Sequence, residues 1–445
     1  MNYEMLFDLL KENRYAEFIR EIDEMNTVDA AEFLACVDTV TLPKVFRLLK
    51  KDTASEIFAE LDHDVQETII QSMSDREVSR VMDDLFIDDT VDMLEELPAS
   101  MVNRILRNTK PELRREINRF LNYPEDSVGS VMTSEFVNIR AEMTVEEAVA
   151  YIRKNGVDKE TVYVIYVTDS ERILLGTLGL RDLLFAQNHE KISDLMETSV
   201  ISIATNADRE EAANLITKYK LLALPVVDSE SRLVGIVTVD DAVEVIHEEA
   251  TEDIEIMAAI APSDKPYWKV GVFRTWLNRI PWLIFLMLSA TFTGMIISGY
   301  ESALGKMVIL TAFIPMLMGT GGNAGGQSSA TIVRGLSLGE IRMGNVLRVV
   351  WKEFRVSILC GATLAVASFV KLLCVDRVGY AVAGVVSLTL LATVVIAKLV
   401  GCTLPILAKR LKLDPAVIAG PFISTIVDAV SLLVYFYIAT MLLHL

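Results

Sequence analysis

Cysteine and histidine are scarce in this 445-residue sequence, which holds four of each. The cysteines Cys36, Cys360, Cys374 and Cys402 lie far apart, and the histidines are scattered as well. No spacing matches a zinc site or a disulfide framework. Thiols placed in this way are typical of small buried apolar residues, and without an imidazole cluster no site for a transition metal is expected.

Signals for secretion and for phosphate binding are also lacking. The first residues, MNYEMLFDLLKENRY, are charged throughout, so no cleaved signal peptide is expected. The segment closest to a phosphate loop, GYESALGKM, has five residues between its glycines instead of four, and Met307 stands where Ser or Thr would bind Mg²⁺. We therefore expect no enzyme and no ATP-driven pump. Any transport is passive or coupled to a gradient.

Charge divides the chain into two parts. The net charge is −19, yet the mean hydropathy is +0.37. Up to Lys265 there are 55 acidic and 27 basic residues, a net charge of −28, and from Pro266 on there are 6 acidic and 15 basic residues, a net charge of +9. This split excludes a single globular domain. A part at −28 is a poor ligand for nucleic acid, which binds cations through its phosphates, but a good candidate for binding cations.

The second part contains five apolar stretches, each near the ~20 residues that a helix needs to cross a membrane. They run over residues 282–299, 307–333, 356–375, 381–407 and 415–443. Lysine and arginine gather before the first stretch, between the second and third, and between the fourth and fifth. Because such loops face the cytoplasm, we expect a multi-pass protein of the cell membrane with its N-terminal part inside and its C-terminus outside.

The second stretch contains the glycine-rich run PMLMGTGGNAGGQSSAT, which is poor helix material. A broken helix that exposes backbone to ions would explain it, as would close packing of helices through small residues. The polar residues Asn323, Gln327, Ser328 and Ser329 favour the ion pathway, because packing does not need them. Candidate pathway residues here are Gly321, Gly322, Asn323 and Gln327.

Asp428 stands alone in the last stretch, GPFISTIVDAVSLLVYFYIATMLL. A carboxylate at the centre of a membrane helix costs about 2.5–3.5 kcal/mol on insertion scales, so such a residue normally faces a pathway or a bundle interior. Ser424 and Thr425 lie one turn earlier and extend a polar stripe. An ion site is favoured over a structural, protonated or internally paired aspartate, because no basic residue lies at the same depth.

Three other charged residues of the second part are expected to have structural roles. Asp414 before Pro415 is expected to cap a helix N-terminus. Lys371 and Lys398 lie toward the ends of their stretches and are expected to extend to the membrane interface.

The first part opens with short helical patterns such as DAAEFLACV, DVQETIIQSM and TVDMLEEL, without strand signals, up to about Tyr123. An array of short helices is predicted. One run, MDDLFIDDTVDMLEEL, is strongly acidic. Asp88 and Asp92 in this run are one helical turn apart and repel each other unless a cation neutralises them.

An internal repeat follows. Residues 131–156 parallel residues 195–220, and each copy leads into a β-rich tail, with Gly176 matching Gly235. The duplication resembles a tandem CBS pair. Since CBS pairs commonly bind adenine nucleotides, the resemblance implies possible ATP binding, with Asp182 and Asp241 facing the ribose hydroxyls. After the repeat, EVIHEEATEDIEIMAAIAPS predicts a helix rich in carboxylates, the hard oxygen ligands that Mg²⁺ and Ca²⁺ prefer.

Together these parts resemble the MgtE family of magnesium channels and transporters, most specifically in GTGGNAGGQSSATIVRGL and in a last span that opens at Asp414-Pro415 and carries Asp428. The resemblance implies a homodimer with a pore on its two-fold axis, where Asp428 holds hydrated Mg²⁺. It implies closure by regulatory Mg²⁺, with ligands from Asp88, Asp92, Asp241, Glu249, Glu252 and Asp253. Lys220 and Gly420-Pro421 depart from the family pattern, and Gly420 is placed at the pore mouth.

The predicted fold is multidomain: an all-α superhelical N domain (1–124), an α/β tandem CBS pair (125–245), an acidic connecting helix (246–265) and an all-α transmembrane domain of five helices (266–445). The predicted function is Mg²⁺ uptake that cytoplasmic Mg²⁺ shuts off. The alternatives are a transporter of Co²⁺ or Mn²⁺, and a membrane-anchored nucleotide sensor. The lack of thiol and imidazole ligands in the polar patches of the spans argues against a soft metal.

Overall fold

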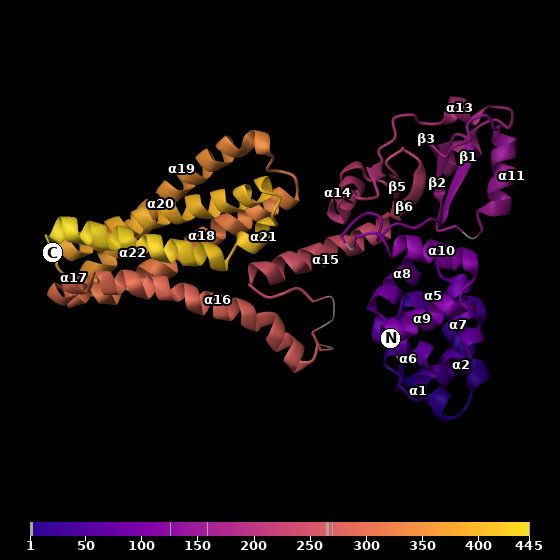
Figure 1. Ribbon diagram of the computed structural model, residues 1–445, viewed down its shortest axis with the longest axis horizontal. Coiled ribbons are helices and arrows are strands. Elements are labelled where there is room, and N and C mark those ends of the chain that lie inside the picture. Colours follow the sequence, from indigo (N-terminus) through magenta and orange to yellow (C-terminus); the bar gives the residue numbers. More distant parts are fainter. Residues whose placement is uncertain (1–2, 125, 158, 264–266, 269, 445) are drawn as a thin grey trace. The chain divides into compact units, whose positions relative to one another are not determined.

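The computed structural model describes residues 3–124, 126–157, 159–263, 267–268 and 270–444. The chain forms two compact units, Met1–Ile246 and His247–Leu445, and the division falls inside helix α15 (Val239–Met257) (Figure 1). The expected boundary between residues 265 and 266 lies outside the described residues, and the other domain limits stay predictions.

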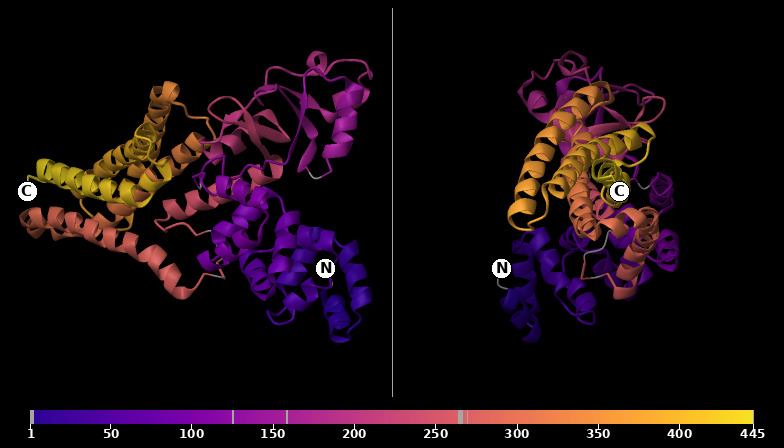
Figure 2. Two further views of the ribbon diagram at one scale, coloured as in Figure 1. Left: turned by 45° about the vertical axis from the view of Figure 1, so that its right-hand side comes forward. Right: turned by 90° about the vertical axis from the view of Figure 1, so that its left-hand side faces the viewer.

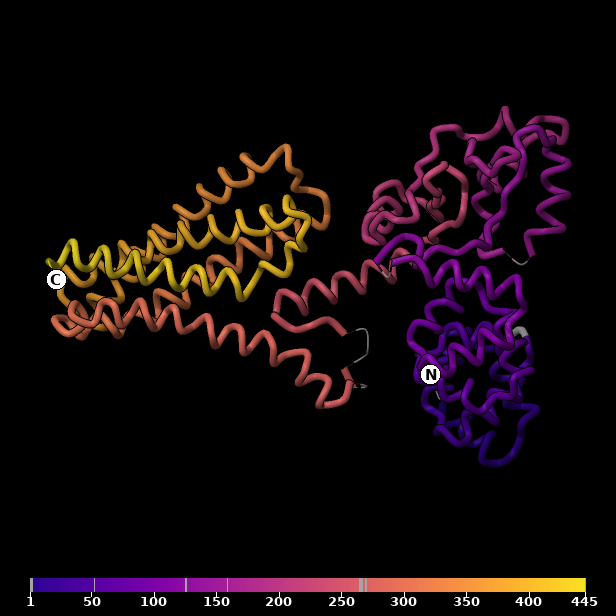
Figure 3. The backbone as a smooth tube through the Cα atoms, in the orientation of Figure 1, coloured from indigo at the N-terminus to yellow at the C-terminus, as the bar shows by residue number. Residues whose placement is uncertain are grey.

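The first unit opens with ten short helices among the described residues. They are α1 (Tyr3–Lys11), α2 (Tyr15–Glu24), α3 (Thr27–Ala35), α4 (Leu42–Phe46), α5 (Lys51–Ala59), α6 (His63–Ser72), α7 (Asp75–Asp84), α8 (Ile87–Glu96), α9 (Ala99–Asn108) and α10 (Pro111–Phe120). Apolar residues spaced three and four apart put one face of each helix into a common core, where Phe18, Phe33 and Phe58 are fully buried. Figure 3 follows this array from indigo to purple and confirms the predicted run of short helices.

Two α/β repeats follow. The first holds β1 (Phe136–Arg140), α11 (Val145–Asn155), β2 (Thr161–Thr168), β3 (Leu174–Gly179) and α12 (Leu180–Phe185). After α13 (Ile192–Leu195), the second holds β4 (Ile203–Ala204), α14 (Arg209–Tyr219), β5 (Ala223–Val227), β6 (Leu233–Thr238) and the start of α15. Each repeat has a three-stranded sheet in which the first strand pairs parallel, and the third antiparallel, to the middle strand.

The two repeats exchange the segments that precede their first strands. Thr133, which leads into the first repeat, pairs with Ile236 in β6 of the second. A Cβ placed on Gly235 would lie 2.6 Å from Met132 Sδ, and one on Gly176 would lie 2.9 Å from Met196 Sδ. The repeated methionines and glycines therefore meet across the pair, because only glycine leaves room for the methionine side chain.

The second unit contains five long apolar helices among its described residues, and these match the five predicted spans. The elements are α16 (Val272–Gly299), α17 (Glu301–Lys306), η1 (Val308–Phe313), α18 (Ile314–Ser337), η2 (Met343–Asn345), α19 (Val346–Cys374), α20 (Tyr380–Arg410), α21 (Pro415–Ile418) and α22 (Pro421–Leu443). Helix α20 is the most enclosed of the five spans, and α16 has no buried residue. Figure 2 shows α16 (salmon) running beside α22 (yellow).

The glycine-rich run is helical, so the predicted break within it is wrong. Helix α18 continues through it from Ile314 to Ser337, and a six-residue 3₁₀ helix, η1, precedes it. Within a membrane each backbone group needs a partner in its own helix, and this requirement outweighs the poor propensity of glycine. Two of the glycines serve close packing. A Cβ on Gly321 would lie 2.9 Å from Val427 Cγ1, and one on Gly325 would lie 2.9 Å from Ile423 Cγ2.

The last span is the one that is interrupted. Helix α21 ends at Ile418, and α22 begins at Pro421. Between them, Gly420 has φ +58°, and a Cβ there would lie 2.3 Å from the Met257 carbonyl oxygen of α15. Only glycine fits this left-handed backbone and this close approach. The break therefore sits where the end of α15 meets the start of α22.

Gly401 gives a test of the packing of α18 against α20. A Cβ at this position would lie 2.2 Å from the Gly325 carbonyl oxygen, and backbone cannot move away as a side chain can. We expect Gly401→Val to lower the yield of monodisperse folded protein about tenfold in size-exclusion chromatography. The matched control is Gly384→Val, also in α20, where nothing lies within 4 Å. Equal yields for the two variants would contradict the close α18–α20 contact.

Candidate ion pathway and acidic clusters

Asp428 lies on α22, near the middle of the last span (Pro415–Leu443), and is half-buried. Within the described part of the chain it has no hydrogen bond and no ion pair. On the same helix, Ser424 Oγ lies 3.2 Å from the position of a Cβ on Gly322, and Ser431 is buried against Gly321. The carboxylate is therefore flanked by contacts between α22 and the glycine-rich helix α18 but has no partner of its own among the residues that the structure describes.

Two predicted pathway residues on α18 share a face. Asn323 and Gln327 are four residues apart and are both exposed, whereas Gly321, Gly325 and Ser328 are buried. Thr425 differs from the other polar residues of α22, because its hydroxyl lies 3.3 Å from Ser289 Oγ of α16. The structure thus places Gly322 and Ser424 together and turns Thr425 toward α16.

The end of α15 carries a second group of acids. Asp253 Oδ2 accepts a hydrogen bond from Ser337 Oγ of α18 at 3.5 Å. Burial, and then the neighbouring charges of Asp414 and Glu249, raise the pKa of the Asp253 carboxyl. Glu249 and Glu252 are half-buried on the same helix. Ile256 and Met257 pack on Val333, Ala416 and Ala419, so this acidic helix end contacts α18 and α21 directly.

In the first unit, carboxylates from three parts of the chain come together. We call the set of Asp88, Asp89 and Asp92 on α8, Glu160 before β2 and Asp241 on α15 the α8–α15 cluster. The backbone N–H of Glu160 donates to the Glu135 carbonyl at 2.9 Å, and the backbone N–H of Thr238 donates to Asp241 Oδ2 at 3.2 Å. The charge of Asp241 acts on both Asp88 and Asp92, so the structure relates these three predicted regulatory residues electrostatically.

Burial and mutual repulsion raise the pKa values in the α8–α15 cluster. Burial is the main cause throughout, and the neighbouring charges that follow are carboxylates. The pKa of Asp92 is raised to about 8, that of Glu160 to about 7 and that of Asp89 to about 6. The pKa of Asp88 is raised well above its usual range, and that of Asp241 is raised as well. These groups hold protons, or need a cation, where ordinary carboxylates are simply ionised.

Other acids of the same sequence run are already paired. Asp83 bonds Lys110 at 2.9 Å, and Asp84 bonds Lys51 at 2.8 Å. Among the described residues, no three acidic, histidine or cysteine side chains converge closely enough to form a complete metal site. The α8–α15 cluster therefore offers hard oxygen donors to a cation that keeps part of its water shell, as Mg²⁺ does.

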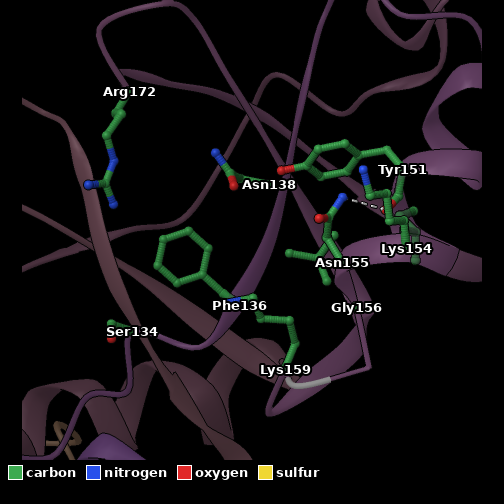
Figure 4. Close-up of a pocket in the computed structure, with 11 residues that line it drawn as sticks. Ser134, Phe136, Asn138, Tyr151, Lys154, Asn155, Gly156, Lys159 and Arg172 are labelled. Atoms are coloured by element: carbon green, nitrogen blue, oxygen red, sulfur yellow. Dashed lines mark hydrogen bonds between the residues drawn. The ribbon is translucent and has the colours of Figure 1, made fainter. Parts of the chain in front are cut away.

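The two residues predicted to bind a nucleotide, Asp182 and Asp241, have different surroundings. Asp182 is exposed on α12, and Asp241 belongs to the α8–α15 cluster. A cavity of about 500 Å³ in the first repeat is lined by polar and basic side chains, among them Asn138, Lys159 and Arg172, which surround its centre in Figure 4. Neither Asp182 nor Asp241 lines this cavity.

Lys398 does not extend to the membrane interface as predicted. It is only 6% exposed, and its Nζ donates to Ser328 Oγ at 3.4 Å. Lys371 is half-exposed near the end of α19 and bonds Asp376 at 2.7 Å. The predicted cap is confirmed, since Asp414 Oδ1 accepts a hydrogen bond from the backbone N–H of Ala416 at 2.8 Å.

Sequence profiles of known families match along the chain. The profile described as a divalent cation transporter, MgtE, matches residues 314–438. The MgtE intracellular N domain matches residues 25–126, and the CBS domain matches residues 128–189 and 192–248. The chain is 38% identical over 405 residues to the magnesium transporter MgtE of Thermus thermophilus, covering 90% of this chain and 89% of the relative. The chain belongs to the MgtE family.

Further relatives agree with this assignment. The MgtE magnesium transporter of Bacillus subtilis is 35% identical over 441 residues, which is 98% of this chain and 96% of the relative. A crystal structure of the cytosolic domain of the Mg²⁺ channel MgtE in complex with ATP is 33% identical with a TM-score of 0.52, covering 55% of this chain and 99% of that one. The soluble part of a magnesium transporter is 30% identical with a TM-score of 0.53, covering 56% and 98%.

Family membership confirms several predictions at once. This MgtE-family chain is a multi-pass membrane protein with a helical N-terminal domain, a CBS pair and five apolar helices. Its MgtE relatives are magnesium transporters and not enzymes, as expected. The predicted site residues stay predictions.

Local patterns in this MgtE-family sequence did not reveal all members of the acidic clusters. Glu160 lies just before β2 and far from α8 in the sequence, and only the fold brings their charges together. Asp89 lies beside Asp88 in the acidic run and belongs to the same cluster. Asp414 was interpreted only as a helix cap, yet its charge also acts on Asp253.

The raised pKa of Asp92 predicts a pH-dependent stability. The folded pKa of about 8 exceeds the unfolded value near 4, so folding takes up a proton and the free energy of unfolding falls as pH rises from about 4 to 8. Asp92→Asn removes this term. In Mg²⁺-free buffer we expect its melting temperature to exceed that of the wild type by about 3 °C or more at pH 8, with a smaller gap at pH 5.

Asp84→Asn is the control for this melting experiment. Asp84 bonds Lys51, so its amide variant gains no such stability at pH 8. A gap between Asp92→Asn and wild type that stayed constant from pH 5 to pH 8 would contradict the repulsion within the α8–α15 cluster.

Proposed function

We propose that this protein is a homodimeric Mg²⁺ channel that mediates Mg²⁺ uptake and is closed by cytoplasmic Mg²⁺. The observation that carries the proposal is Asp428, a carboxylate inside a membrane helix with no partner among the described residues. Because an unpaired charge at that depth is costly, it calls for a cation and for water. The magnesium transporters among the relatives support Mg²⁺ as that cation.

A second copy of the chain completes the pathway in this proposal. Asn323 and Gln327 expose polar groups on α18, and Asp428 needs a second carboxylate to hold a divalent ion. Two Asp428 side chains facing each other across a two-fold axis would supply it. Mg²⁺ gives up its water reluctantly, so the two carboxylates hold the ion largely through its hydration shell. Gly321, Gly322 and Ser424 lie along the same α18–α22 contact, and Gly420 lies at the start of α22, against Met257 of α15. Thr425 is assigned to the α16 side.

Closure follows from the repulsion among acids. The α8–α15 cluster and the acids Glu249, Glu252 and Asp253 gather negative charge, which a divalent cation relieves. At high cytoplasmic Mg²⁺ the ion-bound arrangement is favoured, and at low Mg²⁺ repulsion disfavours it. Helix α15 runs from the α8–α15 cluster to the contact with α18 and α21, and this continuity supports its role in coupling the two.

The orientation and the nucleotide are part of the same proposal. The basic loops support an orientation with the N-terminal part and α15 in the cytoplasm and the C-terminus outside. ATP binding through Asp182 and Asp241 is supported by the relative whose cytosolic domain was solved with ATP.

Flux through the purified full-length chain in liposomes tests the proposal. We expect Mg²⁺ to enter, with Co²⁺ and Mn²⁺ passing more slowly. Faster flux of Co²⁺ or Mn²⁺ would make this a transporter of those ions, and no flux of any divalent ion would favour a membrane-anchored sensor.

A further inference from the structure

Three polar side chains form a chain of hydrogen bonds inside the membrane unit. Lys398 of α20 donates from Nζ to Ser328 Oγ of α18 at 3.4 Å, and Ser328 Oγ donates to Glu353 Oε2 of α19 at 2.8 Å. Lys398 is 6% exposed and Ser328 is 2% exposed. We call these three residues the Lys–Ser–Glu triad.

The chemistry of the triad is complementary. An ammonium group surrounded by apolar side chains needs an acceptor, and a carboxylate needs a donor. The serine hydroxyl meets both needs, because it accepts from the lysine and donates to the glutamate. Val394, Ala397 and Cys402 next to Lys398 on α20 are fully buried, so the ammonium has no route to water on that face. The charges therefore fix one position of Ser328 between two helices.

The triad holds the same part of α18 that meets the candidate pathway. Gly325, three residues before Ser328, packs closely on both sides. A Cβ there would lie 3.2 Å from the Ala397 carbonyl oxygen of α20 and 2.9 Å from Ile423 Cγ2 of α22. One turn earlier, Gly322 contacts Ser424. A rotation or shift of α18 at Ser328 would therefore move Gly322 and Asn323 relative to α22.

We propose that Lys398, Ser328 and Glu353 are positioning residues, which hold the glycine-rich helix α18 at the rotation and depth that set the size selectivity of the cation pathway. This inference rests on the proposed function, since it assigns α18 to that pathway. The triad does not touch the ion. It acts through α18, and its loss changes which divalent ions pass.

The test compares Mg²⁺ and Ca²⁺ flux in liposomes that contain equal amounts of folded full-length protein. Glu353→Gln leaves the buried ammonium of Lys398 without its counter-charge, and Lys398→Met leaves the half-buried carboxylate of Glu353 without its own. We expect each to lower the ratio of Mg²⁺ to Ca²⁺ flux about fivefold. The double variant removes both charges, and we expect it to recover the wild-type ratio within about twofold. Ser328→Ala keeps both charges but breaks the bridge, and it should lower the ratio as well.

Lys371→Met is the matched control, because Lys371 is a half-exposed lysine that bonds Asp376 near the end of α19. Its ratio should equal that of the wild type. The inference is overturned if the single variants keep the wild-type ratio, or if the double variant loses as much as both singles together. If Lys398→Met does not fold, the ratio of Mg²⁺ to Ca²⁺ flux through Ser328→Ala tests the inference instead. If the wild type conducts no divalent ion, the proposed function itself is overturned. If the wild type conducts and the triad variants keep its flux ratio, only the inference about the triad is overturned.

Discussion

We expect Asp428→Asn to abolish Mg²⁺ uptake in liposomes and to fail to support growth at low Mg²⁺ in cells that lack other Mg²⁺ uptake. The amide keeps the size of the side chain and removes the charge. Loss of attraction between a carboxylate and a divalent ion held through water is worth at least about 3 kcal/mol at this depth, or a flux reduction of about 100-fold. Because the carboxylate has no partner among the described residues, no internal ion pair is broken, and the folded protein should be obtained in normal yield.

Asp376→Asn is the matched control for Asp428→Asn. It removes another carboxylate of the membrane part, but one that bonds Lys371 outside the helix core. We expect its Mg²⁺ flux to stay within about twofold of wild type, as a surface ion pair contributes little. Normal flux through Asp428→Asn would show that the ion passes elsewhere.

We expect Asp88→Asn combined with Asp92→Asn to yield a protein that stays open when Mg²⁺ is high on the side of the N-terminal domain. Both carboxyls are repelled by other acids of the α8–α15 cluster, so the divalent ion that relieves this repulsion loses its site in the double variant. We expect the half-inhibitory Mg²⁺ concentration to rise about tenfold or more, because the ion can no longer favour the closed state. The measurement is flux against Mg²⁺ concentration on that side.

The same acidic run provides the control for gating. Asp83 and Asp84 are bonded to Lys110 and Lys51, so the double variant Asp83→Asn/Asp84→Asn removes the same formal charge without touching the α8–α15 cluster. Its half-inhibitory concentration should match that of the wild type. If both double variants shift equally, net charge regulates the protein and the cluster does not.

Patterns that depend on neighbouring residues predicted most of the fold. The three-and-four spacing of apolar residues was enough for the helices of the first unit, and hydropathy was enough for the five spans, because both are local properties. The repeated methionine and glycine positions also showed the duplication. What they pack against, Met132 on Gly235 and Met196 on Gly176, follows only from the fold.

Features set by the surroundings were not predictable in this way. Helix propensities measured in water predicted a break at Gly319–Gly326, but the membrane enforces a continuous helix there. The position of Lys398 along its span indicated a route to the interface, but which side of α20 it occupies depends on Ser328 and Glu353 in other helices. Glu160 joins Asp88 and Asp241 from a distant part of the chain. By contrast, Asp428 could be singled out from sequence, because one charge in an apolar span is unusual by itself.

The most direct test is Mg²⁺ flux through purified wild-type protein and Asp428→Asn, in liposomes with the N-terminal domains facing the bath, at low and high bath Mg²⁺. The account predicts rapid wild-type flux at low Mg²⁺, suppression at high Mg²⁺ and no flux through Asp428→Asn at either. Equal flux through both proteins would contradict it.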